Sequence, residues 1–172
     1  MTKPIGTRVR TFAYGSNMLT SRIRERVPSA TVVGTGRLRA HVIRWHKRSL
    51  DGSAKCDIEN TGRGDDAVWG VLFELDAAEK SALDRAEGLG KGYVERPVNV
   101  VTDDGVVTAI TYVATARDPT LKPYHWYKAF ALAGAKEHNL PPEYIQKLEA
   151  VLSVPDRDSA RAAQNERLLT AG

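Results

Sequence analysis

The sequence has one cysteine, no paired histidines and no long apolar run. Cys56 is the only cysteine among 172 residues, so an internal disulfide is excluded and a reducing cytoplasm is the expected compartment. The four histidines lack the spacing of metal ligands, and we expect neither a metal nor another cofactor. No stretch approaches the ~20 apolar residues that cross a bilayer, and the amino terminus lacks the apolar segment of a signal peptide. We therefore expect a cytoplasmic protein that does not associate with membranes.

The remaining composition is that of an ordinary globular domain. The net charge is +4, a mild excess that permits contact with nucleic acid without implying it. Internal repeats and low-complexity segments are absent, and 172 residues suit one domain with an adequate core. We predict a domain at 1–155 followed by a C-terminal helix or tail at 156–172, in a monomer or homodimer.

The order of the predicted elements indicates an α+β fold. The expected strands are Arg8–Ala13, Thr31–Arg39, Ala40–Arg48, Lys55–Glu59, Ala67–Leu75, Tyr93–Val101 and Val106–Ala114, and the expected helices are 18–27, 76–87, 123–139 and 141–152. The last two strands form a hairpin over the turn Thr102-Asp103-Asp104-Gly105. Strands and helices do not alternate as they do in doubly wound folds. We predict a small, bent, mostly antiparallel β-barrel flanked by helices.

The helix predicted at 76–87 ends on a carboxylate. Asp76 and Glu79 have the spacing of a capping box, and Gly88 is suited to the left-handed residue that ends a helix. An apolar stripe is predicted at Ala78, Ala82, Leu83 and Ala86. Glu87 then lies at the negative end of the helix dipole beside this stripe, which predicts a pKa raised toward that of a general acid/base. The alternative is a solvated glutamate at a frayed helix end.

A second candidate feature follows the first strand. The turn Tyr14-Gly15-Ser16-Asn17 connects the strand Arg8–Ala13 to the next helix. Such a junction presents backbone N–H groups and a positive dipole end, which suit a carboxylate. The alternative is a structural turn in which Ser16 or Asn17 only caps the helix.

Basic residues lie along the second and third predicted strands. Arg37, Arg39 and His41 share one face, whereas Arg44, His46 and Arg48 have the opposite parity. The change of phase predicts a bulge or a sharp bend near Val42. Because no aromatic residues alternate with these charges, we interpret them as a solvated strand face and expect no specific nucleic-acid partner.

Three motifs, in this order, resemble the γ-glutamylcyclotransferase family. The first is Phe12-Ala13-Tyr14-Gly15-Ser16-Asn17, and the second is Leu83-Asp84-Arg85-Ala86-Glu87-Gly88 with Tyr93 after it. The third comprises Tyr127-Lys128, Gly134-Ala135-Lys136-Glu137, Leu140-Pro141, Glu143-Tyr144 and Lys147-Leu148. The resemblance extends to about Val151 and implies a small mixed β-barrel flanked by helices. Between Lys47 and Asp57 the chain is nearer the bacterial type than the animal form, so the leaving group is left open.

The resemblance also implies an activity and a site. The activity is cyclisation of γ-glutamyl-amino acids or γ-glutamyl amines to 5-oxoproline, with release of the free amine. The catalytic residue would be Glu87, and the substrate would be bound by Thr11, Phe12, Ala13, Tyr14, Gly15, Ser16, Asn17, Tyr93 and Tyr127. Two alternatives stay open: removal of a γ-glutamyl group from a carrier-bound or amine metabolite, and a non-catalytic module that binds a small acid.

Overall fold

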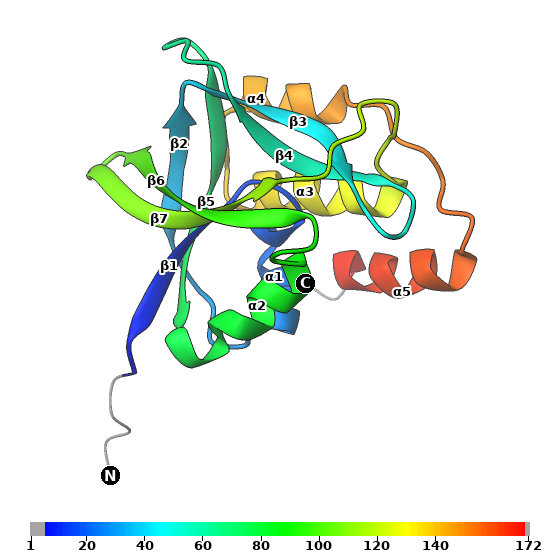
Figure 1. Ribbon diagram of the computed structural model, residues 1–172, viewed down its shortest axis with the longest axis horizontal. Helices are drawn as coiled ribbons and strands as arrows, with labels where there is room; N and C mark the ends of the chain where they lie inside the picture. Colours follow the sequence, from blue (N-terminus) through cyan, green and yellow to red (C-terminus); the bar gives the residue numbers. More distant parts are fainter. Residues whose placement is uncertain (1–5, 171–172) are drawn as a thin grey trace.

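Five strands close into a barrel, which lies on the left in Figure 1. In barrel order they are β1 (Arg8–Ala13), β5 (Ala67–Asp76), β2 (Thr31–Arg39), β6 (Tyr93–Thr102) and β7 (Gly105–Ala114). Neighbours are antiparallel, except that β1 and β7 close the barrel in parallel through Thr11 and Ile110. This computed structural model describes residues 6–170, so the first five residues of the predicted domain 1–155 and the last two of the predicted tail 156–172 lie outside it. The predicted α+β barrel is confirmed.

Strand β5 lies between β1 and β2 in the barrel and is buried on both faces. It pairs with β1 on one side and with β2 on the other. Val71, Phe73 and Leu75 pack into one apolar cluster, whereas Val68 and Leu72 pack into a second. Burial on both faces explains why the sequence of β5 is apolar almost throughout instead of alternating.

The strands β3 (His41–Arg48) and β4 (Ala54–Asn60) form a separate two-stranded sheet. The chain leaves the barrel at Ala40, whose φ is +59°. The sequence predicted a bulge or a sharp bend near Val42; the chain turns sharply at Ala40, and the bulge in the pairing of β3 with β4 lies farther on, between Trp45 and Lys47. Arg37 and Arg39 lie on β2, whereas Arg44, His46 and Arg48 lie on β3 in the other sheet.

Five α-helices and two 3-10 turns are described within residues 6–170. They are η1 (Ser16–Met18), α1 (Thr20–Arg26), η2 (Ala77–Glu79), α2 (Lys80–Glu87), α3 (His125–Glu137), α4 (Pro142–Glu149) and α5 (Ser159–Thr170). Helix α3 packs against η1, α4 and α5 (Figure 1). None of the helices in the described range is long and apolar enough to cross a bilayer.

The start of α2 differs from its prediction, whereas its end agrees. Asp76 accepts a hydrogen bond from Arg8 Nη1 (2.7 Å) and Glu79 accepts one from the Ser29 N–H (3.0 Å), so neither residue caps the helix. Of the predicted apolar stripe, Leu83 is buried, Ala82 is half-buried, and Ala78 and Ala86 are exposed. Gly88 is left-handed with φ +68°, and the Leu89 N–H bonds the Asp84 carbonyl (2.9 Å). Glu87 therefore ends the helix where the sequence indicated.

Candidate active site

One pocket gathers every residue that the sequence singled out for the site. The predicted residues that line it are Thr11, Phe12, Ala13, Tyr14, Gly15, Ser16, Asn17, Glu87, Tyr93 and Tyr127. They come from β1 and the turn after it, from α2, from β6 and from α3. The lining residues that sequence reasoning missed are Ile23, Cys56, Leu83, Thr111 and Tyr112. The structure thus brings the predicted residues together, and their roles remain predictions.

Strand β1 forms one wall of the pocket and is fixed from two sides. Thr111 Oγ1 donates to the Phe12 carbonyl (2.8 Å), and the Tyr14 hydroxyl donates to the Tyr112 carbonyl. Gly70 lies so close that a Cβ there would be 2.4 Å from the Ala13 carbonyl oxygen. Thr11 lines the pocket, and its Oγ1 is buried without a hydrogen-bond partner in the described residues.

Two tyrosines are fixed by the backbone of Cys56 on β4. The Cys56 N–H donates to the Tyr127 hydroxyl (2.9 Å), and the Tyr93 hydroxyl donates to the Cys56 carbonyl (2.6 Å). Gly15 allows the Tyr127 hydroxyl to come close to the turn, since a Cβ at Gly15 would lie 3.0 Å from Tyr127 Oη. Burial raises the pKa of both tyrosines well above the usual value and raises the pKa of the Cys56 thiol to about 12. All three side chains are neutral at pH 7.

Glu87 is part of a three-residue polar cluster with Asn17 and Arg26. Its side chain is only 16% exposed, and Oε1 accepts hydrogen bonds from Asn17 Nδ2 (2.5 Å) and Arg26 Nη1 (3.1 Å). Arg26 also donates to Asn17 Oδ1 (3.0 Å). Within the described residues both hydrogen bonds to the carboxylate end on Oε1, which leaves Oε2 for a ligand.

Arg26 is the charged partner that sequence reasoning missed. The sequence placed Glu87 beside a helix dipole and an apolar stripe, whereas the structure adds a guanidinium from α1. No local pattern marks this contact, because it joins two helices that are far apart in the sequence. The arginine fixes the direction of the carboxylate as well as compensating its charge.

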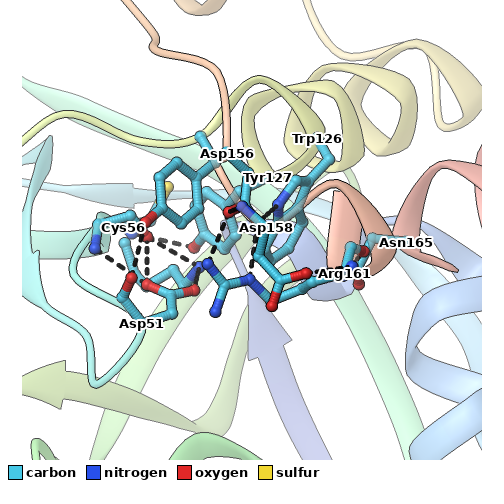
Figure 2. Close-up of polar contacts among 11 residues, drawn as sticks. Asp51, Cys56, Trp126, Tyr127, Asp156, Asp158, Arg161 and Asn165 are labelled. Atoms are coloured by element: carbon cyan, nitrogen blue, oxygen red, sulfur yellow. Dashed lines mark hydrogen bonds and ion pairs between the residues drawn. The ribbon is translucent and has the colours of Figure 1, made fainter. Parts of the chain in front are cut away.

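The C-terminal segment supports the helix that carries Tyr127. Trp126 Nε1 donates to Asp156 Oδ2 (2.9 Å), and Arg161 of α5 makes two hydrogen bonds to the same carboxylate, each 2.6 Å long (Figure 2). The Arg161 guanidinium holds the pKa of Asp156 well below its usual range. Within the predicted helix or tail at 156–172, the structure has the helix α5, which packs against α3.

The arrangement suits proton transfer next to a bound anion. Glu87 has one oxygen fixed and one available for a ligand. The first N–H groups of a helical turn have no partner within that turn, and those of η1 lie at the pocket. Together, a carboxylate that accepts a proton and donors that hold an anion would position and activate a small amino acid derivative.

Comparison with known proteins assigns this chain to a family. The model of the AIG2-like family matches residues 67–148. The γ-glutamylcyclotransferases of Bos taurus and Homo sapiens are each 35% identical over 153 residues, which covers 81% of this chain and 77% of theirs. A solved γ-glutamyl cyclotransferase superposes with a TM-score of 0.83 at 29% identity, covering 96% of this chain and all of that one. A yeast γ-glutamyl cyclotransferase specific to glutathione shares the fold, with a TM-score of 0.61 at 11% identity. The chain belongs to the γ-glutamylcyclotransferase family.

Proposed function

We propose that this protein is a γ-glutamylcyclotransferase. It converts γ-glutamyl-amino acids or γ-glutamyl amines to 5-oxoproline and releases the free amine. The observation that carries this proposal is the position of Glu87, whose Oε2 is available in the same pocket as the turn Tyr14–Asn17. The identity to mammalian γ-glutamylcyclotransferases supports it.

The substrate supplies its own nucleophile in this reaction. Its α-amine attacks the γ-carbonyl carbon, a C–N bond closes the five-membered ring, and the bond to the departing nitrogen breaks. Holding the substrate in this folded shape supplies ~7–11 kcal/mol of the barrier. The amine has an unperturbed pKa of ~8 and must lose a proton to attack. Glu87 takes a proton from the amine and returns one to the departing nitrogen.

The remaining pocket residues bind and orient the substrate. The Ser16 and Asn17 N–H groups bind the α-carboxylate of the glutamyl group or the oxyanion that forms from the γ-carbonyl, whereas the Met18 N–H is bonded to the Gly15 carbonyl. Thr11 offers a buried hydroxyl without a partner. Tyr93 and Tyr127 line the pocket beside the turn and shield the reacting atoms from water. Asn17 and Arg26 hold the Glu87 carboxylate in one orientation.

The proposal includes the setting in which the protein acts. A single buried cysteine is consistent with a reducing cytoplasm, where glutathione and other γ-glutamyl compounds are metabolised. The reaction is classed among transferases or lyases and uses no metal or nucleotide. A monomer or homodimer without specific nucleic-acid binding remains our expectation.

A substrate panel tests the activity. The purified protein is incubated with γ-glutamyl dipeptides, glutathione and γ-glutamyl amines, and 5-oxoproline is measured by mass spectrometry. Products from amines alone would favour a biosynthetic role on an amine metabolite. A rise in melting temperature with a ligand but no product from any compound would favour a non-catalytic binding module.

The variant Glu87→Gln tests the residue that performs the proton transfer. Glutamine retains the hydrogen bonds that Oε1 accepts but cannot take a proton. We expect kcat to fall by roughly 10²–10⁴-fold while substrate still binds. The matched control is Glu166→Gln, on the exposed side of α5, which should leave kcat unchanged. A folded Glu87→Gln protein with a kcat near that of the wild type would refute the mechanism.

A further inference from the structure

A second hollow adjoins the candidate active site and is lined by cationic side chains. It shares Ser16, Glu87, Tyr93 and Tyr127 with the first pocket. The cations that line it are Arg22, Arg26, Lys47 and Lys55. Because Glu87 borders both spaces, a group that leaves from a carbonyl beside Glu87 lies next to these cations. The positive charge of this hollow therefore affects which departing amines the site can bind.

Two of the four cations already have a close anionic partner. Arg26 pairs with Glu87 at 3.1 Å, and Lys55 Nζ lies 2.9 Å from Asp51 Oδ2. The Lys55 ammonium also lies over the rings of Trp126 (4.4 Å) and Tyr127 (4.5 Å). These two cations are therefore compensated by the protein itself.

Lys47 is buried without an anionic partner. Only 9% of the residue is exposed, and within residues 6–170 no carboxylate lies within ion-pair distance of its ammonium. Its Nζ lies 4.7 Å from the centre of the Tyr93 ring. Gly92 makes room for it, because a Cβ there would lie 3.0 Å from Nζ. Burial lowers the pKa of Lys47, and the charges of Glu87 and Asp51, which act against this lowering, do not cancel it.

Arg22 is the second cation without a firm partner. Its Nε is buried and has no hydrogen-bond partner in the described part of the chain. Its ion pair with Glu25 is 4.0 Å long, and the Glu25 side chain is half exposed. Burial and the charge of Arg26 lower the pKa of Arg22 to about 10. Burying cations without partners costs free energy, and an anionic ligand would offset that cost.

We propose that Lys47 and Arg22 form a subsite for a carboxylate carried by the departing amine. This inference rests on the proposed function and makes the two residues determinants of substrate specificity. In a γ-glutamyl-α-amino acid, the second carboxylate is two bonds from the nitrogen that leaves, so it enters the hollow beside Glu87. Compounds with an anionic leaving amine are then preferred over γ-glutamyl amines that carry no negative charge.

A pair of matched ligands tests the subsite without relying on turnover. The ligands are L-γ-glutamyl-L-alanine and L-γ-glutamyl-L-alaninamide, which differ by one negative charge. Their binding is measured by titration calorimetry to the Glu87→Gln protein and, because this change also leaves Arg26 without its counter-ion, to the Glu87→Gln, Arg26→Gln double variant. We expect the carboxylate compound to bind roughly 10–100-fold more tightly, the usual range for hydrogen bonds to charged groups. Equal affinities would overturn the proposal, and this comparison needs no change at Lys47.

Variants then assign the preference to residues. In the Glu87→Gln protein, Lys47→Met should remove most of the tenfold or greater preference for the carboxylate compound over the amide. Lys47→Arg keeps the positive charge and should keep this preference. The control Lys122→Met changes an exposed lysine outside the hollow and should leave the preference intact. A preference that survives both Lys47→Met and Arg22→Gln would contradict the assignment.

Turnover by the protein with Glu87 intact separates this proposal from the proposed function. If the alanine compound binds more tightly but yields no 5-oxoproline, the subsite stands and the proposed activity fails. If both compounds bind and react equally well, the activity stands and the subsite fails. If neither compound binds, the subsite proposal fails, and the remaining compounds of the substrate panel decide the proposed activity.

Discussion

Gly134 of α3 sets how closely this helix approaches the turn that carries the candidate substrate-binding residues. A Cβ at this position would lie 2.5 Å from Leu19 N, 2.5 Å from the Met18 carbonyl carbon and 2.6 Å from Met18 Cβ. Two of these atoms belong to the backbone of η1 and its exit, so a change of side-chain rotamer cannot relieve the contact. Gly134→Ala therefore has to separate α3 from the turn.

The size of the effect follows from these distances. Ordinary van der Waals contact begins at 3.4 Å, so the gap has to open by about 0.9 Å. Overpacking costs ~1–3 kcal/mol, and we expect about 3 kcal/mol because the backbone itself has to move. For a chain of this length that is a fall in melting temperature of roughly 6–12 °C. A displacement of about 1 Å at the site lowers kcat/KM by up to ~10²-fold.

Thermal unfolding and 5-oxoproline release measure the two consequences separately. Gly34→Ala is the matched control, since a Cβ at that position meets no atom within 4 Å. The control should retain the melting temperature and kcat/KM of the wild type. If Gly134→Ala also retained both values, the close approach of α3 to η1 would not be what holds the substrate-binding turn in place.

Three further predictions concern charged residues. Asp57 is fully buried and bonds the Ala114 N–H (2.8 Å), His46 Nε2 (2.7 Å) and Arg117 Nε (3.0 Å), so Asp57→Ala should lower the free energy of unfolding in urea by about 3–5 kcal/mol, and an unchanged unfolding midpoint would contradict this. Burial lowers the pKa of Lys47, so its ammonium is lost at a pH where an ordinary lysine is still charged. The KM for γ-glutamyl-alanine should therefore rise relative to that for γ-glutamyl-alaninamide between pH 7 and pH ~10, whereas a flat ratio would argue against the subsite. The pKa of Asp156 is lowered by Arg161, so the stability that its charge supplies is present above pH ~4 and is lost as pH falls through the lowered value. The difference in melting temperature between the wild type and Asp156→Asn should thus be largest near pH 7 and narrow below pH 4; a constant difference would show that the charge is not responsible.

Local sequence signals predicted the strands well. The turn Thr102–Gly105 fixes the hairpin of β6 and β7, and these two residues face each other in the register. Gly88 ends α2 in the left-handed conformation, as its type and place in the sequence indicate. In both cases the residues that determine the structure are close together in the chain, so the pattern is complete within a short window.

The predictions that failed depended on partners elsewhere in the chain. Asp76 matches the pattern of a helix cap, but its carboxylate is bound by Arg8 of β1. The alanines of α2 match an apolar stripe, but the barrel covers only the part of the helix around Leu83. Arg26 has no local signature because its contact with Glu87 forms only when α1 and α2 pack together. The site residues were found largely through family motifs, whereas the charges around them required the folded chain.

The closure of the barrel has a consequence for the order in which the protein folds. Strand β1 carries Thr11 into the pocket, and its pairing partners Phe73 and Ile110 come from much later parts of the chain. Pairing between distant segments requires large loops to close first, which makes it slow compared with helix formation. The turn Tyr14–Asn17 reaches Glu87 only after this pairing has fixed β1. During refolding from denaturant, helical circular dichroism should therefore return before the ability to produce 5-oxoproline, and the delay between the two signals measures the time that the barrel takes to close.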